Sequence, residues 1–177
     1  MTLRPWSIAF ATCTALLSLP ATAQTTYSVA DNIPYQDTTK VADRIAEECT
    51  ELGSNFSQAI AKHAQEQGVN IVLSTPDAPV APDRLDVVIT DVRSYGNAFT
   101  GHYKSANIQV TRYLNGVESG QTALERRSMG GITGGFKSSC AVLDRTTNTL
   151  ASDIMKWVKT QETQTAPAAS AVVEAAQ

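Results

Sequence analysis

A glycine-rich stretch is the first segment of the chain whose residue types could do chemistry. Residues 130–138 read Gly-Gly-Ile-Thr-Gly-Gly-Phe-Lys-Ser and directly precede a predicted helix. Backbone N–H groups that converge at a helix N-terminus can hold an anion. The stretch departs from a nucleotide phosphate loop, because Phe136 separates Gly135 from Lys137. Gly134, Gly135 and Lys137 are therefore candidates for a simpler anion site, and the alternative is a flexible turn from strand to helix.

The remaining polar residues carry no catalytic or metal-binding signature. A zinc site needs three or four ligands, and neither His63 nor His102 has other ligand types clustered around it. No Gly-x-Ser-x-Gly motif is present, and no particular serine pairs with either histidine. Acids as close as Asp83, Asp86 and Asp91 occur in many surface strands and do not indicate a glycosidase. We predict no metal, no cofactor and no enzymatic activity.

Four aromatic residues are better candidates for contact than for catalysis. Tyr103 and Tyr113 lie on the polar side of a predicted strand, and Tyr95 and Phe99 lie in a glycine-bounded loop. A polar strand face that carries aromatics resembles a binding surface. Tyrosine is also favoured on ordinary solvated sheet faces, where it stabilises cross-strand pairs. The loop likewise has two interpretations, a recognition loop or a loop folded on its own aromatics.

Two of the three cysteines lie in the apolar stripes of predicted helices. Cys49 belongs to a long segment from about Thr38 to Gly68, and Cys140 to a segment from Ser138 to about Thr160. Such stripes face a core, where a thiol is inert, so a redox or catalytic thiol is the weaker interpretation. We predict a Cys49–Cys140 disulfide between the two helices. The first stripe comprises Val41, Ile45, Cys49, Leu52, Phe56 and Ile60.

Two glycines mark specific points in the first predicted helix. Gly53 lies inside it, where glycine costs about 1 kcal/mol relative to alanine. It therefore indicates either a kink or a point of close packing. Gly68 is a suitable residue for the position just beyond the helix end. Asp37 and the two threonines that follow it are suitable N-cap residues.

The segment between the two helices alternates as strands do. The strongest alternation runs from Tyr103 to Leu114, with one apolar and one polar side, as in an antiparallel sheet. Asn115-Gly116 is a strong hairpin signal, although a wider loop through Gly120 would give the next strand a different register. The predicted segments are strand Val69–Ser74, loop Thr75–Asp83, strand Arg84–Val92, loop or wide hairpin Arg93–Gly101, strand Tyr103–Leu114 and strand Gln121–Met129.

These elements predict an α+β fold in the order α-β-β-β-β-α. We expect a two-layer sandwich in which a mainly antiparallel sheet of about four strands carries both helices on one face. Residues 38–160 form the single domain. Residues 24–37 form an extended lead-in that could add an edge strand, and residues 161–177 form a disordered tail that is rich in Ala, Gln and Thr.

The first 23 residues resemble a secretory signal peptide. Arg4 precedes a short apolar run, and Ala21-Thr22-Ala23 is an A-x-A cleavage site. Cys13 has a poor lipobox before it, which argues against a lipid anchor at this position. The run is shorter than the roughly 20 residues that span a membrane, and no second run of that length follows. We therefore predict an exported, periplasmic protein.

Charge excludes one class of partner. The chain has a formal net charge of −3, and removal of residues 1–23, which hold one Arg and no acid, makes it more negative. Non-specific nucleic-acid binding needs a basic footprint, so we expect no nucleic-acid partner. The sequence leaves the oligomeric state open.

The chain also resembles a known class of exported proteins. The signal peptide, the cysteine-bearing helix, the run from Gly134 to Cys140 and the run from Asp153 to Trp157 look like those of small exported proteins of Gram-negative bacteria. The architecture is similar to periplasmic domains of outer-membrane accessory lipoproteins, of the curli-secretion and TolB amino-terminal type. The resemblance implies an envelope location and an accessory role, and it supplies no site residues.

The first hypothesis is therefore a non-enzymatic periplasmic accessory protein. It would bind another envelope protein through the open sheet face, a sheet edge or the loop that carries Tyr95 and Phe99. The second hypothesis is a small-ligand or anion-binding protein, with the site at the glycine turn or under the helices. An unrecognised enzyme and a secreted effector or inhibitor are further alternatives.

Overall fold

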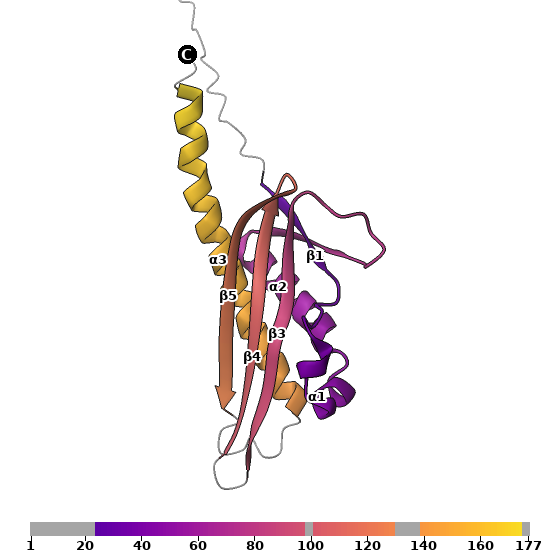
Figure 1. Ribbon diagram of the computed structural model, residues 1–177. Helices are drawn as coiled ribbons and strands as arrows, with labels where there is room; N and C mark the ends of the chain where they lie inside the picture. The colour runs from indigo at the N-terminus through magenta and orange to yellow at the C-terminus, as the bar shows by residue number, and fades with distance from the viewer. Residues whose placement is uncertain (1–23, 98–100, 130–138, 175–177) are drawn as a thin grey trace, which may run out of the picture.

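The computed structural model describes residues 24–97, 101–129 and 139–174. Five strands form one sheet in the order β2-β1-β3-β4-β5. Helices α2 and α3 lie behind this sheet in Figure 1, so the predicted two-layer α+β arrangement is confirmed in outline. The elements are β1 (Thr26–Ala30), the 3-10 turn η1 (Thr38–Lys40), α1 (Asp43–Glu48), α2 (Leu52–Gln67), β2 (Asn70–Ser74), β3 (Arg84–Asn97), β4 (Gly101–Leu114), β5 (Val117–Met129) and α3 (Ser139–Glu174).

The sheet differs from the prediction through its first strand. The extended lead-in contains β1, which lies inside the sheet between β2 and β3 and runs parallel to both. The sheet therefore has five strands and is mixed, while β3, β4 and β5 keep the predicted antiparallel order. Parallel pairing of β1 with β2 needs a long crossover, and the helices between them provide it. Tyr27 and Val29 point from β1 into the core, and each is 1% exposed.

The first predicted helix is divided in the structure. Helix α1 ends at Glu48 and α2 begins at Leu52, with Cys49 in a non-helical conformation at the end of α1. The break leaves the predicted apolar stripe intact, because every member of it is buried. The prediction of one continuous helix was therefore wrong, although its core-facing side was right.

The two glycines of this region have clear physical roles. Helix α2 continues through Gly53, and a Cβ at this position would lie 2.6 Å from the Ile33 carbonyl oxygen. Close packing therefore explains Gly53 better than a kink does. Ser57, one turn further along α2, holds the same segment by donating its hydroxyl to the Asp31 carbonyl at 2.5 Å. Gly68 ends α2 with a φ of 71°, the left-handed conformation that favours glycine.

Strands β3, β4 and β5 form two consecutive hairpins. The pairing of β3 with β4 extends to Asn97 and Gly101, so most of the predicted loop at 93–101 is strand. Positive φ angles at Asn115 and Gly116 give the two-residue turn that joins β4 to β5. Arg112 pairs with Gly120 and Tyr113 pairs with Glu118, so Ser119 is the extra residue of a bulge. The bulge settles the register that the sequence left open.

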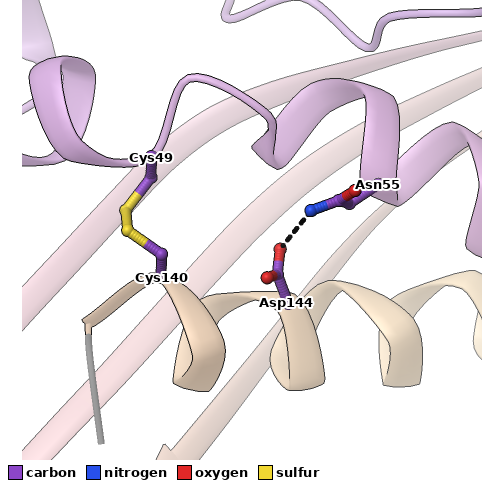
Figure 2. Close-up of a disulfide and its surroundings, with 4 residues drawn as sticks. All are labelled: Cys49, Asn55, Cys140 and Asp144. Atoms are coloured by element: carbon purple, nitrogen blue, oxygen red, sulfur yellow. Dashed lines mark hydrogen bonds between the residues drawn. A yellow bond between two sulfur atoms is a disulfide. The ribbon is translucent and has the colours of Figure 1, made fainter.

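The predicted disulfide joins the two parts of the helical layer. Cys49 and Cys140 are bonded, with their Cα atoms 5.3 Å apart and a sequence separation of 91. Figure 2 shows the bond connecting the junction of α1 and α2 to the start of α3. Nearby, the Asn55 side-chain amide of α2 donates to the Asp144 carboxylate of α3 at 3.3 Å. The disulfide therefore fixes one end of the contact between α2 and α3.

Helix α3 is longer than its sequence pattern predicts. The prediction ends it near Thr160 and assigns 161–177 to a tail, whereas the structure continues the helix to Glu174. In Figure 1 its C-terminal part projects beyond the sheet. In the described ranges, no helix is long and apolar enough to cross a membrane.

Candidate functional site

The face of β3, β4 and β5 that points away from α2 and α3 is the main candidate site, and we call it the open face. Its residues alternate with core residues such as Val87, Ile108 and Val110, which are at most 4% exposed. No described helix covers this face in Figure 1. Its described side chains are Arg84, Asp86, Val88, Asp91, Arg93, Tyr103, Ser105, Asn107, Gln109, Thr111, Tyr113, Glu118, Gln121, Ala123, Glu125 and Arg127.

Three ion pairs organise the open face. Arg84 Nε lies 3.2 Å from the Asp86 carboxylate, and Arg93 pairs with Asp91 in the same strand. In β5, Arg127 Nε lies 2.6 Å from the Glu125 carboxylate. Each pair joins residues two apart in a strand, which share a face because side chains alternate.

Two interactions link these pairs across the strands. The Arg84 guanidinium lies 3.6 Å from the centroid of the Tyr113 ring, a cation–π contact between β3 and β4. The hydrogen bond that Arg127 donates to Glu125 raises the pKa of Arg127, and the positive charge of Arg93 on β3 opposes this rise. Arg93 and Arg127 both flank Ser105 in the sheet register. The open face thus presents fixed charged groups, with two arginines in one row.

The predicted polar side of β4 is only partly solvated. Ser105 and Thr111 are buried, at 6% and 8% exposure, although they lie on the open face. Asn107 is partly buried, and its Oδ1 atom has no hydrogen-bond partner in the described part of the chain.

The structure separates Tyr103 from Tyr113, two of the four candidate contact aromatics. Tyr103 and Tyr113 lie on the open face at opposite ends of β4, and both are partly buried. Tyr95 is the register partner of Tyr103, so these two positions are adjacent in the sheet. Phe99 lies outside the described residues.

The candidate anion site is not described by the structure. Gly134, Gly135 and Lys137 all lie outside the described residues, so the anion-site prediction stays untested. His63 contacts Glu66, with Nδ1 2.9 Å from the carboxylate. Across residues 24–97, 101–129 and 139–174, no group of three or more His, Cys, Asp or Glu side chains is arranged to hold a metal ion.

A buried polar cluster beneath α3 is the feature that the sequence analysis missed. Arg112 lies on the core side of β4 and is 1% exposed. Its Nε donates to the Ser119 hydroxyl of β5 at 2.9 Å. Beside it, the Tyr27 hydroxyl of β1 donates to the Glu162 carboxylate of α3 at 3.2 Å. The cluster therefore joins three strands to the C-terminal half of α3.

Burial and charge set the properties of this cluster. Burial is the largest cause that raises the pKa of Tyr27 to about 12. The charge of Arg112 lowers this pKa, while Glu162, through its charge and its hydrogen bond, and Asp83 raise it. Because Arg112 and Tyr27 are each 1% exposed, the cluster is an internal anchor for α3 rather than a surface site.

The sequence carried a weak signal for this anchor. Arg112 occupies a core position in the alternation of β4, where a charged residue requires polar partners. Its neighbours were not recognisable, because Tyr27 lay in the predicted lead-in and Glu162 in the predicted tail.

Comparisons with known proteins define the class of fold. The sequence matches no protein-family model and no curated protein at a significant level. A DUF330-family protein from Xanthomonas campestris is similar in structure, with a TM-score of 0.52, 8% identity, 84% of this chain covered and 93% of that one. A minor lipoprotein from Acinetobacter baumannii aligns with a TM-score of 0.43 and 6% identity, over 73% of this chain and 93% of that one. At 8% identity, the Xanthomonas similarity shows a shared fold.

Proposed function

We propose that this chain is a non-enzymatic accessory protein of the cell envelope that binds another envelope protein through its open face. The observation that carries the proposal is the uncovered face of three long strands, on which ion pairs hold the charged side chains in place. The helical layer and the disulfide stabilise the opposite side of the sheet.

The proposed location is the periplasm. Residues 1–23 have the pattern of an export signal. The Cys49–Cys140 disulfide supports the same location, because structural disulfides persist in oxidising compartments such as the bacterial periplasm.

The geometry of the open face favours a polar partner surface. Arginine and tyrosine are enriched in protein interfaces, and Arg84, Arg93, Arg127 and Tyr113 all lie on this face. Binding usually immobilises long side chains at a cost of about 0.5–1.5 kcal/mol each. Ion pairs that hold these arginines before binding reduce that cost. The matching partner surface would present carboxylates and hydrogen-bond acceptors to the row that contains Arg93 and Arg127.

Charge reversal on the open face tests the proposal. Tagged full-length chain is purified from solubilised envelopes, and the double variant Arg93→Glu with Arg127→Glu is compared with the unchanged chain. We expect a defined envelope protein to co-purify with the unchanged chain. The recovered amount of this protein should fall at least tenfold with the double variant. The two arginines are exposed, so the variant should remain folded by circular dichroism.

A matched control makes the same charge change on the helical layer. Lys62 of α2 and Lys159 of α3 are exposed, so Lys62→Glu with Lys159→Glu alters the net charge equally. This control should retain the partner. Equal recovery with all three proteins, or loss with the control alone, would contradict binding through the open face.

A further inference from the structure

The two edges of the sheet differ in how they are protected. The β2 edge is short, and Pro76, Pro79 and Pro82 follow it closely. Strand β5 forms the other edge over Val117–Met129 and pairs with no described strand except β4. Its exposed charges (Glu118 and Glu125 to Arg127) and the Ser119 bulge lie toward its two ends, and the segment between them, Gly120 to Leu124, has neither a charge nor a proline. Charges, prolines and bulges are the features that usually protect a sheet edge. The backbone of this central segment of β5 is therefore a template for a further strand.

The sequence of β5 is self-complementary in one antiparallel register. Ala123 is the midpoint of Val117–Met129, so a two-fold axis at Ala123 pairs two copies of β5 symmetrically about the unprotected central segment. This register places Gln121 opposite Glu125 of the other copy, and Ser119 opposite Arg127. No like charges face each other, and Gly120 lies opposite Arg126.

We propose that β5 pairs with β5 of a second copy of this chain, with Ala123 on the two-fold axis, to form one continuous sheet across a homodimer. The register fits the side chains on both faces of the strand. Arg126 is already held by Asp153 of α3 on the helix side, and Glu125 on the open-face side has room for a donor from Gln121. The proposal uses the strand edge, so it does not depend on the partner proposed for the open face.

A lysine at position 123 and a lysine at position 121 should change the dimer affinity in opposite directions, and this contrast tests the register. Ala123 is exposed, and Ala123→Lys places two lysines directly opposite each other, which destabilises a strand pair. Gln121→Lys places a lysine opposite Glu125 at two symmetric positions. Sedimentation velocity on the oxidised mature chain should therefore show a dimer whose Kd rises at least fivefold with Ala123→Lys and falls with Gln121→Lys.

A charge-swap experiment shows whether a variant loses the dimer because the β5 contact is weakened or because the chain no longer folds. Ala123→Glu should weaken the dimer as Ala123→Lys does, and an equal mixture of the two variants should recover dimer through opposite charges. The control substitution Asn70→Lys, on the β2 edge, should leave the Kd unchanged. A chain that stays monomeric at 100 times its cellular concentration would overturn the proposal. A dimer that is insensitive to charge at Ala123, or a mixture that fails to recover it, would also overturn the proposal.

Discussion

At the residue scale, Tyr27 and Tyr35 differ in what their hydroxyl groups contact. The Tyr27 hydroxyl donates to Glu162, whereas the buried Tyr35 hydroxyl has no hydrogen-bond partner among the residues described. We predict that Tyr27→Phe lowers the free energy of unfolding by about 0.5–1.5 kcal/mol, the usual net value of one hydrogen bond. Tyr35→Phe should cause no loss, because it removes a hydroxyl that is buried without a partner. Urea denaturation of both variants measures the contrast, and equal losses would contradict the assignment.

The same tyrosine predicts a dependence of stability on alkaline pH. The pKa of Tyr27 is raised from 10.0 to about 12, chiefly by burial, so the unfolded chain loses this proton first as the pH rises. Between these values the unfolded state binds fewer protons than the folded state, and the free energy of unfolding therefore falls as the pH rises. Tyr35, whose pKa is also raised by burial, adds to the fall.

Denaturation at a series of pH values from 9 to 12 checks this sign. Tyr27→Phe should show a smaller fall than the unchanged chain over the same range, since the ionising group is absent. An identical fall in both proteins would show that Tyr27 does not carry the effect.

Individual residues were predictable where one local pattern determines them. Cys49 and Cys140 lie in predicted apolar helical stripes of a chain whose first residues resemble an export signal, and these patterns were enough to predict their bond. Arg112 was not predictable in the same way, because Ser119 and Tyr27, with which it interacts, come from two other elements. A buried charge becomes understandable only when the segments around it are assembled.

At the scale of elements, Gly53 fixes the distance between α2 and the segment after β1. Gly53→Ala should lower the free energy of unfolding by about 1–3 kcal/mol, because the new methyl group would overlap the Ile33 backbone. Alanine is the better helix former, so propensity alone predicts the opposite sign. Thermal and urea unfolding of the variant would show whether the substitution destabilises the fold, as packing predicts, or stabilises it, as helix propensity predicts.

Gly120 provides a matched control for this prediction. A Cβ there would lie 3.3 Å from the Gln161 side chain, which can move, so Gly120→Ala should cost less than Gly53→Ala. A stabilised Gly53→Ala protein would contradict the packing role of Gly53.

Element boundaries were predicted less well than element types. The periodicity of the first helix is insensitive to the break at Cys49, because the stripe faces the core on both sides of it. Strand β1 has only two buried positions, too few for a clear alternation, and its interior place depends on long-range parallel pairing. The composition of residues 161–177 indicated a disordered tail, yet α3 continues to Glu174.

At the scale of the whole molecule, the disulfide closes a loop of 91 residues between the two parts of the helical layer. The chain-entropy model gives such a bond about 4–5 kcal/mol, an upper value because native strain subtracts from it. The double variant Cys49→Ser with Cys140→Ser should therefore melt at a markedly lower temperature, as should the reduced chain. Calorimetry of the oxidised, reduced and double-serine proteins tests this, and three equal melting temperatures would contradict it.

The layered arrangement was predictable in outline because amphipathic helices and alternating strands must bury their apolar sides together. The organisation of the open face was not predictable to the same extent. Its ion pairs join residues two apart and are visible in the sequence, but charged residues at that spacing are common in solvated strands. Register places them in rows across three strands.

The measurement that tests the proposed function most directly is photo-cross-linking in living cells. A photo-reactive residue replaces Gln109, near the centre of the open face, and in parallel replaces Lys62 on α2. We predict that the probe at Gln109 captures one dominant envelope protein and that the probe at Lys62 captures none of it. Capture at Lys62 alone, or no capture at Gln109 from cells that produce the folded protein, would contradict a contact role for the open face.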